Sequence, residues 1–368
     1  MHMIVIGADP YKSQHTLAAV EAATGELLDD LTVAAKPKGH AELLRWGRAL
    51  GPERLWAIED CRHLTGNLER YLVAHGERVV RVAPKHMAGA RRSVRERGKS
   101  DAIDALAVAR AALREGPDKL PSAWLDHEAM QIKLLLDHRE DLEQESTRIV
   151  CRLRWHLVDL WPELELPVRA FERIVWLDRV ARRLARAEQS TRVSICREQI
   201  RTLKALLRRS RELERELTTL VKAKNPALLE LPGCGPLTAA KLIAQTAGAE
   251  RFASEAHFAR LAGVAPVPVS SGRKDRHRLD HGGDRQLNCA LHRIAVTQKR
   301  MHAPAQHYLA RKQAEGKTNR EALRCLKRQL VRTVLRLLRP PLSSDRTDPL
   351  AMNKLTKIKE PLQVAALT

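Results

Sequence analysis

Residues 3–9, MIVIGAD, join a continuous apolar run to a carboxylate at its end. Such a run is typical of a buried strand. Residues 15–33 predict a second and a third strand that meet in a turn at Thr24–Gly25. Residues 54–60, RLWAIED, predict another short buried strand, which ends in Glu59 and Asp60. The pattern around the opening segment therefore favours a sheet whose strands end in acids.

Helical segments alternate with the later strands. Residues 41–50 and 66–76 predict helices, the second ending at Gly76, and residues 78–84 predict a strand closed by Pro84. Strands followed by alternation with helices are typical of a mixed α/β domain. We place this domain at residues 1–118.

The chain has 368 residues, a net charge of +21 and an isoelectric point near 10.2. This excess predicts a polyanionic partner, with nucleic acid ahead of an anionic membrane surface. Aromatic residues make up only 3% of the chain, which favours contact with backbone phosphates over base stacking. No apolar run approaches the ~20 residues of a membrane span, no signal peptide is evident, and the six cysteines are scattered. We expect a cytoplasmic protein with no membrane partner.

Asp101 and Asp104 lie three residues apart at the start of an apolar helix, 98–113, GKSDAIDALAVARAAL. One interpretation is local: Ser100 caps the helix, and acids are favoured in its first turn. The other joins them to Asp9 and Glu59, because a carboxylate at the end of a buried strand is costly unless solvated, paired or metal-bound. Four acids at one sheet edge would bind two divalent cations, Mg²⁺ with Mn²⁺ as a substitute, as in two-metal polynucleotidyl transfer. Strand alternation places Asp60 on the other face from Glu59.

Residues 122–225 are almost wholly helical in pattern and strongly basic. Between 169 and 224 there are 16 Lys and Arg against 7 Asp and Glu. Leucines at 203, 206, 207, 213, 217 and 220 keep helical spacing. Long charged helices of this kind form hairpins or coiled coils, so this part is either a solvated spacer or a self-association seam that also touches nucleic acid. We expect a homo-oligomer, dimer or tetramer, and nucleic-acid contacts from Arg182 and Arg186.

We expect residues 226–340 to form a third unit and residues 341–368 to be a flexible tail. The segment LLELPGCGPLTAAKLIA, 228–244, holds a tight turn with Gly233 and Gly235. It is similar to a helix-hairpin-helix turn, whose amides can hold a phosphate, although many helical hairpins need glycine at a turn. We therefore expect a mostly α-helical domain after the helical linker.

Together these motifs resemble one family of insertion-sequence transposases. The segments IGADPYKSQHTLAAV, WAIEDCRHLTGNLERYLVAHGERVVRVAP and RGKSDAIDALAVARAA resemble the N-terminal DEDD domain of the family to which pilin-gene invertases belong, and the stretch from LLELPGCGPLTAAKLIA to NCALHRIAV resembles its second domain. The resemblance covers residues 3 to about 338. It implies a RuvC-like fold of the RNase H class, with Asp9, Glu59, Asp101 and Asp104 as the four acids.

The same resemblance implies a serine nucleophile and a 5′-phosphoserine DNA intermediate. The matching position is Ser271, with Ser270 as the adjacent alternative. Gly272 permits close backbone approach, and nearby cations attract phosphate. These cations are Arg273, Lys274, Arg276 and Arg278. The family is also similar to guided recombinases, in which a structured (bridge) RNA pairs with target and donor DNA.

Three functions remain open from the sequence. The first is a site-specific DNA recombinase that moves an insertion element. The second is a RuvC-like, metal-dependent nuclease in which water attacks and Ser271 is structural. The third is a non-catalytic architectural protein whose acids are helix caps.

Overall fold

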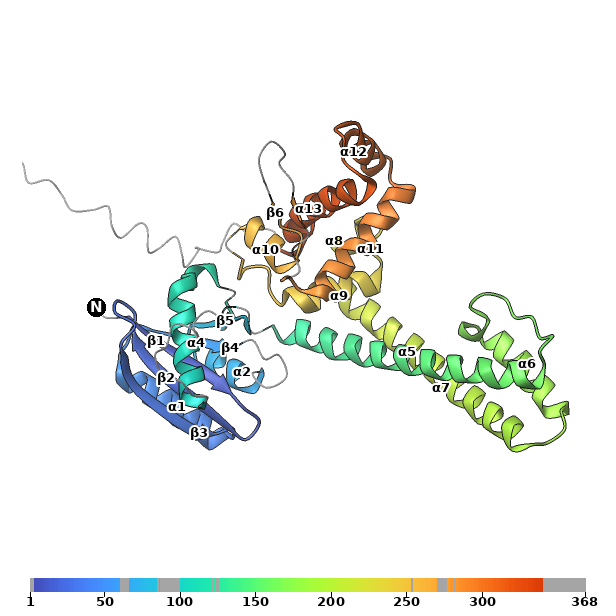
Figure 1. Cartoon of the computed structure of the whole chain (residues 1–368), viewed down its shortest axis with the longest axis horizontal. Coiled ribbons are helices and arrows are strands. Elements are labelled where there is room, and N and C mark those ends of the chain that lie inside the picture. The colour runs from blue at the N-terminus through green and yellow to red at the C-terminus, as the bar shows by residue number, and fades with distance from the viewer. Residues whose placement is uncertain are drawn as a thin grey trace, which may run out of the picture.

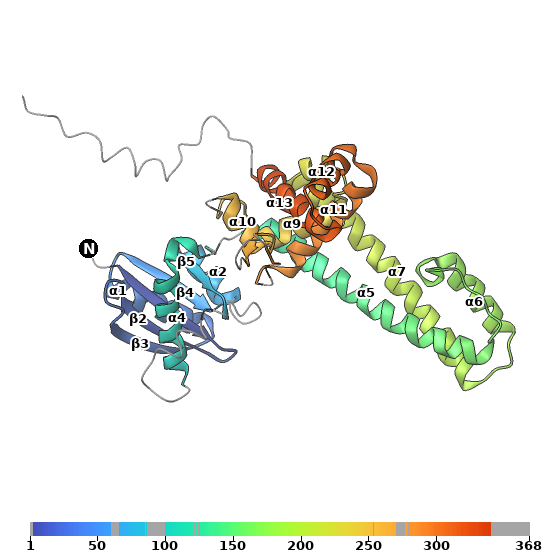
Figure 2. The same ribbon diagram turned by 45° about the horizontal axis from the view of Figure 1, so that its top comes forward.

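The computed structural model describes most of the chain in three parts (Figure 1). The described residues are 3–59, 66–84, 86, 100–120, 122–123, 126–252, 254–269, 277–278, 280 and 282–339. A sheet domain occupies the N-terminal end, a long helical hairpin projects away from it, and the C-terminal helices gather at the base of the hairpin (Figures 1 and 2). No helix among these residues is long and apolar enough to cross a membrane.

The N-terminal domain is built on a five-stranded mixed sheet with the order β3-β2-β1-β4-β5. Its strands are β1 (Ile4–Pro10), β2 (Gln14–Glu21), β3 (Leu27–Ala34), β4 (Arg54–Glu59) and β5 (Val79–Val82). β1, β2 and β3 are antiparallel neighbours, whereas β4 and β5 run parallel to β1. Gly25 forms the predicted turn between β2 and β3 with a φ of +72°, which favours glycine. The prediction of an α/β domain is confirmed.

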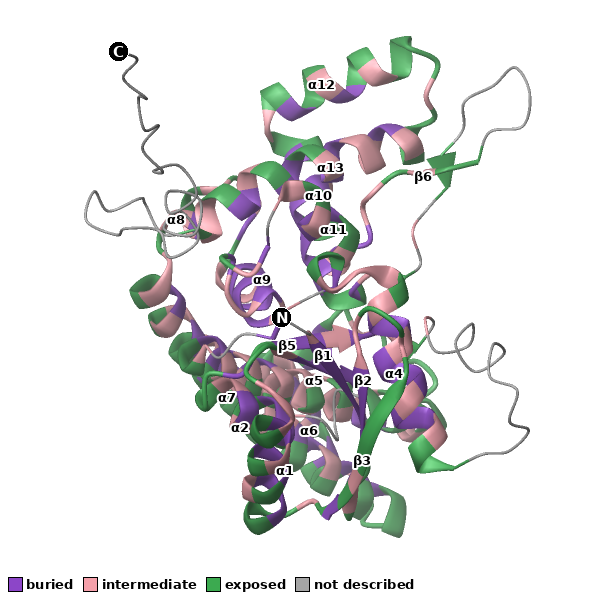
Figure 3. Ribbon diagram, turned by 90° about the vertical axis from the view of Figure 1, so that its left-hand side faces the viewer, coloured by how far each residue is buried: buried purple, intermediate pink, exposed green. Residues whose placement is uncertain are grey.

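Helices cover both faces of this sheet. They are α1 (Pro37–Leu50), α2 (Gly66–Ala74) and α4 (Asp101–Glu115), with a 3₁₀ turn at Pro117–Lys119. Side chains alternate along β1, so that Ile4 and Ile6 pack with α1 and α2 while Val5 packs with α4. Figure 3 shows the consequence: the central strand is buried and the edge strand β3 is largely exposed. The alternation decides which side chains share a face with α4.

Two helices of 34 residues form the hairpin, as the helical spacing predicts. They are α5 (His127–Leu160) and α7 (Thr191–Lys224), each about 50 Å long at 1.5 Å per residue. A 3₁₀ turn (Ala170–Glu172) and α6 (Ile174–Arg186) connect them at the far end. That end has its own core, which includes Leu153, Phe171 and Leu184. The tip is therefore packed independently of the hairpin's base.

The C-terminal part is mostly helical, as predicted. Its elements are α8 (Ala227–Glu230), α9 (Pro236–Thr246), α10 (Glu255–Leu261), β6 (Val267–Pro268), β7 (His277–Arg278), α11 (Arg285–Met301), α12 (Ala303–Ala314) and α13 (Asn319–Leu338). Their core also takes in Ile132 and Leu136 of α5 and Leu217 and Val221 of α7. The base of the hairpin and the C-terminal helices thus share one core.

Candidate active site

Two of the predicted acids end neighbouring parallel strands. Ala8 of β1 pairs with Ile58 of β4, so Asp9 and Glu59 follow at equivalent positions. Adjacent strands lie about 4.8 Å apart, which places the two acids side by side. Both fall on the face of the sheet that α4 covers. Val5 in β1, and Leu55 and Ala57 in β4, pack on that face, and each lies an even number of residues before the acid of its strand. Both are partly exposed. Asp60, the alternative to Glu59, lies outside the described residues.

Gly7 lets α4 approach β1 closely. A Cβ at this position would lie 2.2 Å from the carbonyl oxygen of Ala105 and 2.5 Å from the amide nitrogen of Ala109, both of them backbone atoms. No L side chain fits without moving the helix. A glycine inside an apolar strand is the sequence signal for such an approach, and it is the one feature of this site that the sequence analysis missed although the signal was present.

The direction of α4 brings Asp101 and Asp104 to the same edge as Asp9 and Glu59. Near its start, the Nε2 of Gln14 donates to the Oδ2 of Asp101 at 3.1 Å, and Gln14 begins β2 beside the end of β1. Further along, Arg110 Nε donates to the carbonyl of Gly25, at the opposite end of the sheet, at 3.3 Å. Hence α4 runs antiparallel to β1, with its first turn above the carboxyl ends of β1 and β4.

The first turn of α4 also confirms the helix cap. Ser100 Oγ accepts a hydrogen bond from the amide of Ile103 at 3.3 Å. Asp101 is exposed, whereas Asp104 is only 8% exposed. The amide end of the helix stabilises negative charge at both positions, so the capping role and a role in the site are compatible.

The four acids therefore lie on three elements at one edge of the sheet. Within the described ranges, no three His, Cys, Asp or Glu side chains are close enough together to hold a metal ion. The structure thus supplies the common edge, and the side chains do not converge on a single point. As donors, four carboxylates fit hard divalent cations such as Mg²⁺ and Mn²⁺.

The candidate serine lies in the segment between β6 and β7. Val267 pairs with Arg278, and Pro268 with His277, in an antiparallel ribbon. Arg278 is exposed on β7. Gly272 and five residues of the predicted site lie outside the described residues. The five are Ser270, Ser271, Arg273, Lys274 and Arg276.

The chain on either side of this ribbon is held together by a partly buried polar network that the sequence did not predict. A Cβ on Gly283 would lie 2.2 Å from the backbone of Gly263, so the two flanking loops touch. Asn288 Nδ2 donates to the carbonyls of Ala262 and Gly263 at 2.8 and 3.0 Å. Lys327 Nζ donates to Asn288 Oδ1 at 2.6 Å, and burial lowers the pKa of this lysine. The base of the serine segment is therefore firmly fixed.

Two family models match the chain in succession. A DEDD transposase model of IS110 type matches residues 6–162, and the model of the transposase IS116/IS110/IS902 family matches residues 225–311. The first match contains all four acids, and the second contains the segment with Ser271. The chain belongs to the IS110/IS116 family of insertion-element transposases.

Relatives of this transposase come from other insertion elements. The 44.8 kDa protein of IS116 from Streptomyces clavuligerus is 27% identical over 91% of this chain and 94% of its own length. The 42 kDa protein of IS900 from Mycobacterium paratuberculosis is 25% identical over 90% of this chain and 95% of its own length. Among solved structures, T. thermophilus RuvC in complex with a Holliday junction matches at 22% identity and a TM-score of 0.25, covering 31% of this chain and 97% of that one.

The glycine turn of the transposase packs against α11. Gln298 Nε2 donates to the carbonyl of Pro232 at 2.8 Å. Gly233 has a φ of +85°, and a Cβ there would lie 3.0 Å from Thr297 Cβ. Gly235 is exposed, caps the N-terminus of α9 and has open space around its Cα. Only Gly235 thus presents its backbone to solvent at this helix end.

Arg182 and Arg186 lie exposed on α6, at the end of the hairpin away from the C-terminal helices (Figures 1 and 2). They fall in residues 163–224, between the two matched ranges. The structure therefore separates these two arginines from the acids, on a different part of the molecule.

Proposed function

We propose that this transposase recombines DNA through a serine nucleophile at a site completed by four acids. The observation that supports the acids is their common edge: Asp9 and Glu59 end adjacent parallel strands, and Gln14 holds Asp101 above them. The family membership supports DNA as the substrate. The serine and the RNA guide rest on the family resemblance of the sequence.

Ser271 would provide the nucleophile. Its Oγ attacks the phosphorus of a backbone phosphodiester, an O–P bond forms, and the bond from phosphorus to the 3′ oxygen breaks. The serine proton passes to a base, and the leaving 3′ oxygen ends as a hydroxyl. A 3′ hydroxyl of the partner strand then attacks the phosphoserine and restores Ser271. Because no water is consumed, the phosphodiester is conserved through the exchange.

Asp9, Glu59, Asp101 and Asp104 would hold one or two divalent cations, which supply charge stabilisation for the attacking and leaving oxygens. Asp104 is buried in the first turn of α4. Gln14 fixes the carboxylate of Asp101. The protein's own contribution is thus an edge of the sheet domain along which four carboxylates are held.

The basic residues would hold the phosphate backbone. Arg273, Lys274, Arg276 and Arg278 surround the serine in sequence, while the exposed amide end at Gly235 suits a phosphate in the same unit. A structured guide RNA beside target and donor DNA is consistent with a net charge of +21. In this proposal, base pairing between the guide RNA and the DNA selects the sequence, and the protein binds the phosphate backbones of both nucleic acids.

A nicked suicide substrate tests the serine. If Ser271 attacks, the cut traps the protein on a DNA 5′ end in a divalent-cation-dependent adduct that survives denaturant. Ser271→Ala removes the adduct and leaves nucleic-acid binding intact, whereas Ser270→Ala retains it. Peptide mapping that places the adduct on Ser270 would correct the residue and keep the mechanism.

The competing function, a nuclease that uses water, gives a different result. Cleavage then survives Ser271→Ala and releases a free 5′ phosphate. Absence of an adduct on a substrate that the unmodified protein binds and cuts would refute the serine mechanism.

A further inference from the structure

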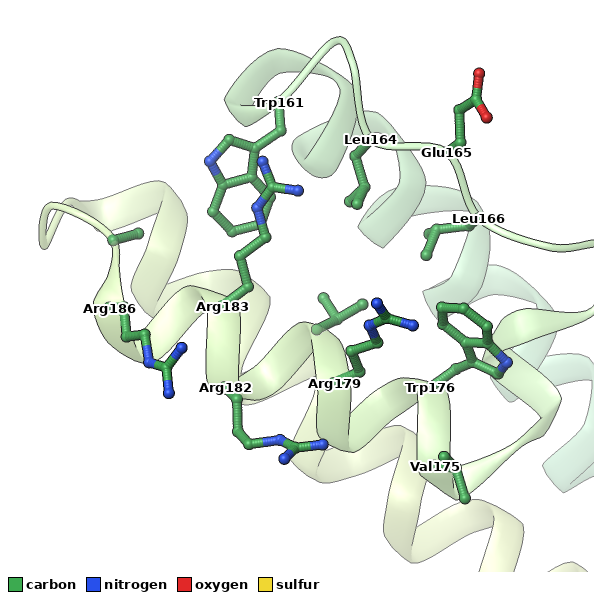
Figure 4. Close-up of a pocket in the computed structure, with 12 residues that line it drawn as sticks. Trp161, Leu164, Glu165, Leu166, Val175, Trp176, Arg179, Arg182, Arg183 and Arg186 are labelled. Atoms are coloured by element: carbon green, nitrogen blue, oxygen red, sulfur yellow. The ribbon is translucent and has the colours of Figure 1, made fainter.

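The far end of the hairpin carries a groove, here called the tip groove. Its cavity is about 920 Å³, within the range of small-ligand sites. The residues that matter for its chemistry are Trp161, Trp176, Arg179, Arg182, Arg183 and Arg186. Figure 4 shows Arg183 over the indole of Trp161 and Arg179 beside that of Trp176, while Arg182 and Arg186 extend from α6 on the side away from Trp161. Apart from Trp161, which lies at the end of the first matched range, the lining residues fall in the segment that neither family model matches.

Two arginines in the tip groove stack on tryptophans. The guanidinium carbon of Arg183 lies 4.3 Å from the centre of the Trp161 ring, and that of Arg179 lies 5.0 Å from the centre of the Trp176 ring (Figure 4). Each pair holds a planar cation against a planar ring, which is a cation–π arrangement. Guanidinium planes and indole faces are both surfaces on which a nucleic-acid base stacks. The 3% aromatic content of the whole chain conceals this local concentration.

Charge in the tip groove favours a polyanion over a second copy of the chain. Four arginines line it against one carboxylate, Glu165. Arg183 pairs with Glu163 at 2.5 Å, while the other three make no ion pair within the described residues. A two-fold contact between copies would bring this cationic surface against itself, and like charges would repel.

We propose that the tip groove binds an unpaired nucleotide, with its base stacked on an Arg–Trp pair and its flanking phosphates on Arg182 and Arg186. The base must be unpaired, because a base inside a duplex already has both faces covered by its neighbours. The proposal rests on nucleic acid as the partner of the transposase, and it is independent of the acids and of the serine. An RNA loop and a melted DNA strand share this chemistry.

Fluorescence anisotropy in chelator-containing buffer tests the groove without cleavage. The probes are a short single strand as DNA, the same sequence as RNA, an abasic strand of equal length, and a duplex. We expect the unmodified protein to bind at least one of the two base-containing single strands about tenfold more tightly than the abasic strand. Preference for RNA or DNA identifies the source of the nucleotide.

Variants of the groove separate stacking from charge. Trp176 is partly exposed and lies outside the tip core, so Trp176→Ala should fold and lose the preference for bases, while Trp176→Phe keeps most of it. Arg183→Lys retains charge without a planar stack and should weaken binding of the base-containing strand alone. Trp155, 75% exposed on α5 outside the groove, gives the matched control Trp155→Ala, which should change nothing.

Two results would overturn the proposal. One is equal affinity for base-containing and abasic strands, which would leave only a phosphate surface. The other is loss of self-association in Trp176→Ala by light scattering, with the preference for bases unchanged, which would make a second copy the occupant. Failure of the proposed function would look different. Asp9→Ala would then still recombine DNA, while the preference of the tip groove for base-containing strands would persist.

Discussion

The acidic edge of the sheet domain and the basic tip of the hairpin reach their geometry by different routes. The acids come from β1, β4 and α4, and some forty residues separate each of these elements from the next. The register of β1 with β4, and the close approach of α4 to Gly7 in β1, bring the acids together. The four arginines at the tip occupy positions 179, 182, 183 and 186 of one helix. Spacings of three, four and seven put them on one face without any long-range contact. The acidic edge therefore depends on tertiary packing, whereas the basic face needs only a helix.

The largest expected effect is on the acids. Replacing Asp9, Glu59, Asp101 or Asp104 singly with Ala should lower recombination by about two to three orders of magnitude or more, because each would hold a cation at the reacting phosphate. Each variant should remain folded, so that the loss of activity reports the site and not the fold. Activity assays paired with circular dichroism measure both.

Asp118→Ala is the matched control for the acids. Asp118 lies in the same domain, 90% exposed and paired only at the surface with Arg78, so its loss should leave activity unchanged. Full activity of Asp101→Ala and Asp104→Ala would return those two residues to helix capping alone and reduce the acidic edge to Asp9 and Glu59.

The next effect concerns the packing of α4 on β1, at a residue that takes no part in the reaction. Gly7→Ala should destabilise the sheet domain by about 2–3 kcal/mol, because the new methyl group meets the Ala105 carbonyl and α4 must move. Activity should fall with it, since α4 carries two of the acids, while binding of single strands at the tip groove should persist. Urea denaturation and anisotropy measure the two consequences.

Gly235→Ala is the control for Gly7→Ala. A Cβ at Gly235 has no neighbour within 4 Å, so the free energy of unfolding should hardly change. If Gly7→Ala proved equally harmless, α4 would not be positioned by this contact, and the contrast between the two regions would lose its basis.

The sequence predicted the acidic edge because the relevant signals are local. Apolar runs ending in Asp9 and Glu59, and a capped helix beginning at Ser100, fix which elements carry the acids. Alternation along β4 separates Glu59 from Asp60 in the prediction, and in the structure Glu59 lies on the α4 face. That Asp9 and Glu59 meet at one edge follows from parallel strands ending together, whereas the place of Asp101 and Asp104 depends on how α4 packs on the sheet.

Contacts between distant segments could not be predicted in this way. Lys327 and Asn288 are separated by 39 residues and look like ordinary polar positions on basic helices, yet they hold the loops beside the serine segment. The stack of Arg183 on Trp161 has a similar origin, because Trp161 caps the C-terminus of α5 while Arg183 lies on α6. An average aromatic content says nothing about which rings meet which cations.

The smallest effect expected is a pH dependence that distinguishes the sheet domain from the hairpin helix α7. His15 of β2 stacks on His40 of α1, with their Nε2 atoms 3.1 Å apart in a buried setting. Burial, and then the charge of His40, lower the pKa of His15 from 6.5 to about 4. In the unfolded chain the imidazole titrates near its ordinary value. The unfolded state therefore binds more protons between these two pKa values.

Stability of the sheet domain should consequently be complete above about pH 6.5 and fall as the pH drops toward 4. His15→Leu should flatten this dependence, because Leu suits the apolar face shared with Leu17 and cannot take a proton. Hydrogen exchange of peptides, corrected for the intrinsic effect of pH, should show the loss in residues 3–34 and not in 191–224. Equal loss in both segments, or an unchanged pH profile in His15→Leu, would mean that carboxylates elsewhere set the acid sensitivity. The sheet domain and the hairpin would then differ in how their sites are built, but the stability of both would depend on pH in the same way.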